Sequence, residues 1–259
     1  MKQLRVEKKL LHYTGKAIAD YNMIQTGDHV LVCVSGGKDS LTLVKILKLL
    51  ELKTNRKFTI SALMVNLGQP DWNEERATLS LKYMNVPYEV LHQTNIFSIV
   101  SQKTQQGKSL CPLCSRLRRG IIYRYAKMHG FKKIALGHHR DDLIESLLMS
   151  ICFSGEIRSM PPKLLTNDEK HIVIRPLVYC QENDIIQYVD AMGFVTQTCQ
   201  SCYDQTKSAR VKMKRLISQL ASNNSKIPSN MLNALRNVRK TQLMDHKLHT
   251  FKTLETKIK

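Results

Sequence analysis

Several features are missing from this chain of 259 residues. No apolar run approaches the length of about 20 residues that a membrane-spanning helix requires. The N-terminal residues are charged, which is unlike a secretory signal. There is also no internal repeat and no long low-complexity segment, which argues against repeat and fibrous architectures. We therefore expect a cytoplasmic protein that makes no contact with a membrane.

Acidic residues are few, with 21 Asp and Glu against 40 Lys and Arg, and the formal net charge is +19. This balance favours a large anionic partner such as nucleic acid over a small neutral ligand. The basic residues are clustered. Residues 115–133 contain no acid, and residues 203–259 carry 13 Lys and Arg against 3 Asp and Glu. Such stripes suit a phosphate backbone, and binding through them should weaken as salt rises.

Strand-like and helix-like segments alternate along the chain. Strands are predicted at residues 30–34, 59–65, 88–91, 134–136 and 172–174. Helices are predicted at residues 4–21, 41–50, 74–84, 116–129, 142–152 and 184–192. This rhythm predicts an α/β fold, a Rossmann-like parallel sheet with helices on both faces. We divide the chain into an N-terminal helical segment (1–27), one catalytic domain (28–202) and a basic helical C-terminal tail (203–259).

A glycine-rich loop joins the first predicted strand to the helix that follows it. It consists of Ser35, Gly36, Gly37, Lys38, Asp39 and Ser40. The Walker pattern is absent, and the loop has the shorter form S-G-G-x-D-S. Its glycines allow the backbone to approach a phosphate at the N-terminus of a helix. Lys38 supplies positive charge, and Asp39 can hold Mg²⁺ that bridges phosphates. The loop predicts a nucleotide site.

Three polar residues follow the strand predicted at residues 134–136. His138, Asp141 and Asp142 lie at a strand end, where ligands of open α/β sheets gather. They are candidates for positioning Mg²⁺ or a substrate group. Helix capping is an equal alternative, since Asp141 suits an N-cap and acids in a first turn complement the helix dipole. The two roles are compatible.

Four of the seven cysteines form two Cys-x-x-Cys pairs, Cys111/Cys114 and Cys199/Cys202. In a cytosolic protein these are more typical of metal ligands or thiols than of disulfides. Four thiolates can hold a structural zinc ion, and three can hold a [4Fe-4S] cluster with one iron left open. A redox dithiol and unrelated buried cysteines are two further alternatives. The remaining three cysteines lie in apolar segments and are expected in the core. They are Cys33, Cys152 and Cys180.

Five motifs together resemble one family. They are Ser-Gly-Gly-Lys-Asp-Ser (35–40), Cys-Pro-Leu-Cys-Ser-Arg-Leu-Arg-Arg-Gly (111–120), Ala-Leu-Gly-His-His-Arg-Asp-Asp (135–142), Met-Pro-Pro-Lys-Leu (160–164) and Ile-Val-Ile-Arg-Pro-Leu (172–177). In this order they are similar to the bacterial tRNA 2-thiocytidine synthetases, also called tRNA-cytidine 2-sulfurtransferases. The resemblance covers about residues 5–205, which makes it far more specific than the first loop alone.

This resemblance implies a PP-loop ATP pyrophosphatase fold that uses ATP, Mg²⁺ and an oxygen-sensitive [4Fe-4S] cluster. Carried over by motif, the cluster ligands are Cys111, Cys114 and Cys202, and Cys199 is left as a spare thiol. The family pattern has Pro before the later pair and Gly after it, where this chain has Thr198 and Tyr203. The resemblance further implies tRNA as substrate and a sulfur donor of the cysteine desulfurase type. It leaves a homodimer open.

The implied activity is ATP-dependent 2-thiolation of the cytidine at position 32 of the tRNA anticodon loop. In this hypothesis residues 35–40 align ATP so that the C2 oxygen attacks the α-phosphate, with Lys38 and Asp39 as catalytic residues. Mg²⁺ stabilises the phosphates, and sulfide held at the open iron then displaces AMP. The extruded base would be flanked by phosphates held by the arginines beside the first cysteine pair. These are Arg116, Arg118 and Arg119, for which a solvated helix face is the alternative.

Other functions share parts of this pattern. A thiolase acting on another tRNA base, such as uridine, would need the same motifs. An enzyme that adenylates or amidates a small molecule would need the loop but neither the basic stripes nor the cysteine pairs. A zinc-stabilised RNA-binding protein without activity would need the cysteines and the charge.

Overall fold

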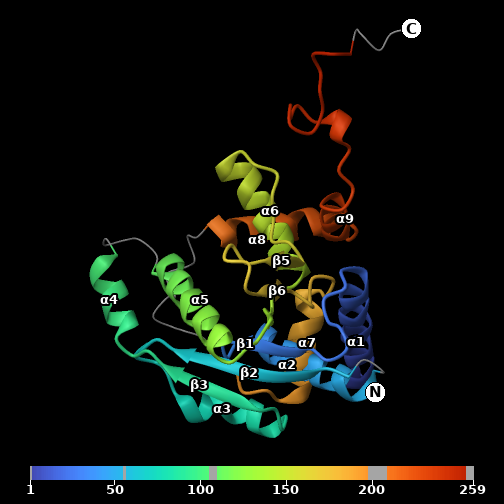
Figure 1. Cartoon of the computed structure of the whole chain (residues 1–259). Helices are drawn as coiled ribbons and strands as arrows, with labels where there is room; N and C mark the ends of the chain where they lie inside the picture. Colours follow the sequence, from blue (N-terminus) through green and yellow to red (C-terminus); the bar gives the residue numbers. More distant parts are fainter. Residues whose placement is uncertain (1, 55–56, 105–109, 198–208, 255–259) are drawn as a thin grey trace.

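The computed structural model describes residues 2–54, 57–104, 110–197 and 209–254. Within these ranges six strands form one sheet in the order β3-β2-β1-β4-β6-β5 (Figure 1). The strands are β1 (His29–Val34), β2 (Thr59–Asn66), β3 (Tyr88–His92), β4 (Lys133–Ala135), β5 (Lys163–Leu165) and β6 (Ile172–Ile174). All neighbours are parallel except β5, which pairs antiparallel with β6 at the edge. The predicted α/β class and parallel sheet are confirmed, and β5 is an addition that the sequence analysis missed.

Strand β1 lies in the middle of the sheet and buries both of its faces. The register places Val32 opposite Ala62 of β2 and Ala135 of β4. Side chains alternate along a strand, so Val32 and its alternate neighbours pack on one side while Leu31 packs on the other. The sheet therefore has two hydrophobic cores, and its central strand ends in the glycine loop.

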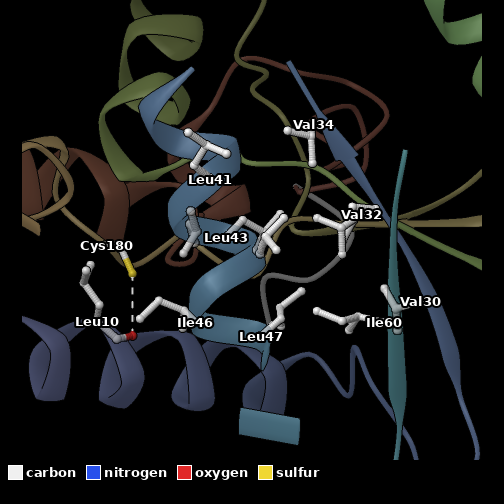
Figure 2. Close-up of a cluster of buried hydrophobic side chains, with 14 of the residues drawn as sticks. Leu10, Val30, Val32, Val34, Leu41, Leu43, Ile46, Leu47, Ile60 and Cys180 are labelled. Carbon is white, nitrogen blue, oxygen red and sulfur yellow. Dashed lines mark hydrogen bonds between the residues drawn. The ribbon is translucent and has the colours of Figure 1, made fainter. Parts of the chain in front are cut away.

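The first core lies between the sheet and four helices, α1 (Lys2–Asp20), α2 (Lys38–Lys53), α3 (Glu74–Tyr83) and α7 (Glu182–Met192). Figure 2 shows the contact between β1 and α2, where Val30 and Val32 face Leu43 and Leu47. Leu10 of α1 is fully buried beside Cys180. Helix α1 packs against α2 and α7, and the helix predicted at residues 4–21 is confirmed.

The second core lies on the opposite face, under α4 (Ile96–Lys103) and α5 (Cys111–Met128). Helix α4 was not predicted, since only Val100 of its residues is buried. The predictions that three cysteines lie in the core have different outcomes. Cys180 is buried and Cys33 is half-buried, but Cys152 is exposed, so its placement in the core was wrong. It lies near the C-terminal end of α6 (Arg140–Ser154), where Ile151 and Phe153 are also exposed.

The described part of the basic tail is largely helical. Helices α8 (Ala209–Asn223) and α9 (Ile227–Ala234) pack against α6 and against each other, and a short 3-10 helix (Lys240–Gln242) follows. Met213 and Ile217 are the buried side chains of α8. Among the helices of the described ranges, none combines the length and the apolar character needed to cross a membrane.

Candidate functional site

Hydrogen bonds of Ser35 and Ser40 hold the loop after β1 in a closed turn. The Ser40 hydroxyl donates to the carbonyl of Gly37 at 2.9 Å, and the backbone N–H of Ser35 donates to the Ser40 hydroxyl at 3.2 Å. Gly37 is the N-cap of α2, and no side chain caps the helix there. The N–H groups of the first turn of α2 therefore lack a capping side chain, which is the arrangement that binds phosphate.

Two glycines of this region are required by close backbone contacts. Gly36 has φ of 84°, and a Cβ on it would lie 3.1 Å from the carbonyl oxygen of Gln197. Gly137, which follows β4, would place a Cβ 3.1 Å from backbone atoms of Asp39 and Ser40. Side chains at either position would push the loop away from its neighbours. Gly36 thus allows the loop to contact Gln197, and Gly137 allows the chain after β4 to approach the start of α2.

The charged residues of the loop form a partly buried network. The Lys38 ammonium lies 3.0 Å from Asp39 and 3.2 Å from Glu182 of α7. Burial disfavours the charged form of Lys38, but the carboxylates of Asp39 and Glu182 outweigh it and raise the pKa of Lys38. Burial also opposes ionisation of Glu182, yet hydrogen bonding to Lys214 and the charge of Lys38 lower its pKa. Both groups are therefore charged at neutral pH.

Asp39 retains unused capacity as an acceptor. Its Oδ1 atom is buried and accepts no hydrogen bond from the described residues, although the Lys38 ammonium lies 3.0 Å and His139 Nε2 lies 3.5 Å away. A buried carboxylate oxygen without a hydrogen bond is costly unless a cation or donor reaches it. With the phosphate-binding turn beside it, Asp39 fits the role of a Mg²⁺ ligand.

The acids after β4 cap two different helices. The prediction that Asp141 is the N-cap of α6 was wrong, because His139 occupies that position. The backbone N–H of His139 donates to the Asp142 carboxylate at 3.1 Å. Asp141 instead accepts the backbone N–H of Glu182 at 2.8 Å, which ties the start of α6 to the start of α7. The capping role is thus met by Asp142, while Asp141 joins two helices that surround the loop.

His138 is a neutral hydrogen-bonding group. Its Nδ1 accepts a hydrogen bond of 3.3 Å from Nε of Arg175, the residue after β6. Burial, followed by the positive charge of Arg175, lowers the pKa of His138 to about 4. The imidazole is therefore uncharged at neutral pH.

One pocket of about 380 Å³ connects the loop with helix α5. Ser35, Asp39 and Ser40 line it on the loop side, and Ser115, Arg118 and Arg119 line it on the α5 side. Gly137, His138, Asp142 and Arg210 complete its polar lining. The sequence-predicted residues of the loop, of the segment after β4 and of α5 are therefore brought to one cavity.

The first cysteine pair opens helix α5. Cys111 and Cys114 are three residues apart in the first turn, so they share one side of the helix, and Ser115 of the pocket comes next. Cys114 is buried and Cys111 is half-buried. Cys199 and Cys202 lie outside the described residues. Among the described residues, no group of three or more His, Cys, Asp or Glu side chains is placed to hold a metal ion.

Both described chain ends that flank the later cysteine pair lie at this site. Before the pair, the backbone N–H of Gln197 donates to the carbonyl of Gly36 at 2.9 Å. After it, Arg210 of α8 lines the pocket and lies 3.4 Å from Asp142. The loop, the first cysteine pair and the two ends of segment 198–208 therefore border one region.

The three predicted arginines differ in position. Arg118 is half-buried and Arg119 is exposed, and both line the pocket. Arg116 is exposed and does not contribute to the lining. The pocket also contains Cys33, where burial raises the pKa of the thiol to about 12 despite the charge of Arg118. A thiol with so high a pKa is a poor nucleophile.

Sequence reasoning missed four residues of this site. Gln197, Glu182 and Arg210 come from distant segments, and only the fold reveals their contacts with the loop and with Asp142. Arg175 belongs to the sequence motif at residues 172–177, but the motif does not reveal the contact between Arg175 and His138.

A strand, an S-G-G-x-D-S turn and an open helix N-terminus define a protein of the PP-loop class. The PP-loop domain family matches residues 3–220 of this chain. Proteins of similar sequence indicate a narrower family within the PP-loop class. The chain is 53% identical to the tRNA-cytidine(32) 2-sulfurtransferase of Coxiella burnetii (strain Dugway 5J108-111), over 98% of this chain and 99% of the relative. It is 56% identical to the enzyme of that name from Legionella pneumophila (strain Paris), over 96% of this chain and 88% of the relative.

The chain therefore belongs to the tRNA-cytidine(32) 2-sulfurtransferase family, as its motifs predict. Among solved structures it resembles the U34-tRNA thiolase NcsA from Methanococcus maripaludis, a structure that contains a [4Fe-4S] cluster. The TM-score is 0.73 at 17% sequence identity, and the match covers 90% of this chain and 78% of that chain. At this identity the likeness concerns the fold.

Proposed function

We propose that this chain uses ATP to replace the C2 oxygen of cytidine 32 in tRNA by sulfur. The observation that carries the proposal is the single pocket that joins the PP-loop to the face of α5 directly after Cys111 and Cys114. The names of the sulfurtransferase relatives support the same reaction.

In this proposal the triphosphate of ATP binds at the PP-loop. Ser35, Gly36, Gly37 and Ser40 surround the phosphates, together with the N–H groups at the start of α2. Asp39 would hold Mg²⁺, and Lys38 lies beside it to neutralise phosphate charge. Asp142, which also lines the pocket, is a second candidate ligand for this ion.

The reaction needs activation because the C2 carbonyl of cytosine is a poor electrophile and its oxygen is a poor leaving group. The C2 oxygen attacks the α-phosphorus of ATP and pyrophosphate leaves, which converts the oxygen into part of an AMP leaving group. Sulfide then attacks C2, and AMP departs with the former C2 oxygen. Lys38 and the α2 N-terminus stabilise the charge that develops on the phosphates in the first step.

The cysteines provide the sulfur side of the site. We propose that Cys111, Cys114 and Cys202 hold a [4Fe-4S] cluster, which supplies an iron atom without a protein ligand where sulfur can bind. Two thiols in one turn of α5 suit this role, since the pocket that begins at the next residue, Ser115, is also lined by Arg210, and Gln197 contacts the loop of that pocket. The cluster named for NcsA supports it. Cys199 remains a spare thiol, and a cysteine desulfurase-type protein is the proposed sulfur donor.

The basic surfaces would hold the tRNA. Arg118 and Arg119 lie where phosphates flanking an extruded base would enter the pocket, and Arg116 lies outside it on the same helix. The tail from residue 203 onward would extend this surface, since α8 carries four basic residues and no acid. We propose residues 28–202 as the catalytic unit, with residues 1–27 and 203–259 as additions to it, of which the tail contributes Arg210 to the pocket.

Anaerobic purification followed by a thiolation assay tests this function. The protein should be brown and contain iron and sulfide. With ATP, Mg²⁺ and sulfide it should form 2-thiocytidine at position 32 of tRNA that lacks this nucleoside, detected by mass spectrometry. A thiolated uridine instead would identify the uridine thiolase. A colourless protein with one zinc ion and no thiolated product would identify an RNA-binding protein.

A further inference from the structure

Three sequence motifs meet at Arg175, and the proposed function leaves two of them, 160–164 and 172–177, without a role. The Arg175 Nη1 atom donates to the carbonyl of Pro161 at 2.5 Å, and its backbone N–H donates to the carbonyl of Pro162 at 2.9 Å. Its Nε atom donates to Nδ1 of His138 at 3.3 Å. Arg175 is only 8% exposed. The segments 135–142, 160–164 and 172–177 are thus connected through one fixed guanidinium.

This arrangement determines which nitrogen of His138 carries the proton. A guanidinium can only donate hydrogen bonds. The Nδ1 atom must therefore accept, and the single proton of the neutral ring lies on Nε2. Among the described residues, no group accepts a hydrogen bond from this Nε2–H. Since His138 lines the pocket, the ring offers the pocket one donor.

The pocket wall around His138 suits the flat ring of a nucleobase. Leu136, Ile122 and Ile134 supply apolar surface, and Tyr123 adds an aromatic ring. A base that reacts with both ATP and sulfur must lie between the PP-loop and α5, which is the space that His138 borders. The target base is therefore favoured over the adenine of ATP as the partner of His138.

We propose that His138, held by Arg175 as the Nε2–H tautomer, recognises the target cytosine by donating a hydrogen bond to its N3 atom. N3 of cytosine is an unprotonated acceptor, whereas N3 of uracil carries a proton and would oppose the donor. The same bond would stabilise negative charge that moves to N3 when sulfur adds at C2. His138 thus contacts the substrate, and Arg175 is a positioning residue. This inference rests on the proposed function.

An atomic substitution in the substrate tests the contact. Anticodon stem-loops with cytidine or 3-deazacytidine at position 32 are compared, because 3-deazacytidine lacks the N3 acceptor. We expect the wild-type preference for cytidine, measured as the ratio of kcat/KM values, to fall about tenfold in His138→Ala. His138→Gln, whose amide can donate from a similar place, should retain part of it. His129→Ala removes an exposed histidine outside the pocket and should keep the full preference.

An unchanged ratio in His138→Ala would overturn the proposal. A rise in KM for ATP with an intact ratio would assign His138 to adenine and would also overturn it. These outcomes differ from failure of the proposed function, in which the wild-type protein would not thiolate cytidine at all.

The tautomer is measurable in the resting protein. With ¹⁵N-labelled histidine, NMR spectra should show an unprotonated Nδ1 and a protonated Nε2 for His138, assigned by comparison with His138→Gln. Arg175→Met should shift the ring toward the other tautomer and lower the preference for cytidine. Should this variant fail to fold, the wild-type spectrum still decides, because a protonated Nδ1 would overturn the proposal.

Discussion

The backbone N–H of Gln197 donates a hydrogen bond of 2.9 Å to the carbonyl of Gly36. This contact joins the chain just before the later cysteine pair to the turn of the PP-loop. It is close because Gly36 adopts φ of 84°, and a Cβ there would lie 3.1 Å from the carbonyl oxygen of Gln197. The phosphate turn and the chain at Gln197 therefore depend on each other.

Gly36→Ala should weaken ATP binding while leaving most of the fold intact. A side chain at positive φ costs about 1–2 kcal/mol, and it would also press on Gln197. We expect the Kd for ATP to rise at least about tenfold in equilibrium binding measurements. Gly15→Ala in α1 is the control, because a Cβ there meets nothing within 4 Å. ATP affinity equal to that of the wild type in Gly36→Ala would contradict the role given to this turn.

Asp39→Asn should reduce tRNA-dependent pyrophosphate release by about 100-fold, the scale of losing one electrostatic contact in a transition state. The amide has nearly the same shape but cannot supply the charge that Mg²⁺ requires. Asp190→Asn, an exposed position of α7, should release pyrophosphate normally. Normal release by Asp39→Asn would remove Asp39 from the mechanism.

Arg119→Ala should lower the affinity for tRNA and make binding less sensitive to salt. Each lost phosphate contact reduces the slope of log K against log salt by about 0.7–0.9. The control is Lys127→Ala, an exposed cation near the other end of α5. Filter binding at several salt concentrations measures both slopes. If the two variants gave equal slopes, Arg119 would be only part of a solvated helix face.

Glu145→Gln should stabilise the protein at alkaline pH. Burial, followed by the charge of Asp142, raises the pKa of Glu145 from 4.5 to about 7, and Arg210 opposes this. Stability from the protonated carboxyl is complete below about pH 4.5 and is lost as pH rises through about 7. At pH 8 the variant should show a Tm at least about 2 °C above wild type, the change that about 1 kcal/mol produces. At pH 5 the difference should shrink, and a constant difference would contradict this assignment.

Most of the sheet could be predicted from the sequence. Strands β1 and β2 are continuous apolar runs because both of their faces are buried, and their ends were predicted within one residue. Strand β5 was missed because it has three residues, and Leu164 and Leu165 are both exposed, so no alternation reveals it. Helix α4 buries one side chain and leaves a weak pattern.

The parts of the site that follow strand ends were also predictable, because parallel strands place their carboxyl ends on one edge of the sheet. This brings residues 35–40 and His138 together. The contact that Asp141 makes was not predictable, since its partner is the backbone of Glu182 in another helix. The tautomer of His138 likewise depends on Arg175, which only the pairing of β4 with β6 brings near.

The central claim is that activation by ATP and supply of sulfur occur at two ends of one pocket. Cys111→Ala separates them most directly, in an anaerobic single-turnover assay that measures pyrophosphate and 2-thiocytidine in the same sample. We predict tRNA-dependent pyrophosphate release within about twofold of wild type, the scale of a change below about 0.5 kcal/mol, and no 2-thiocytidine. Formation of 2-thiocytidine by this variant at the wild-type rate would contradict the account.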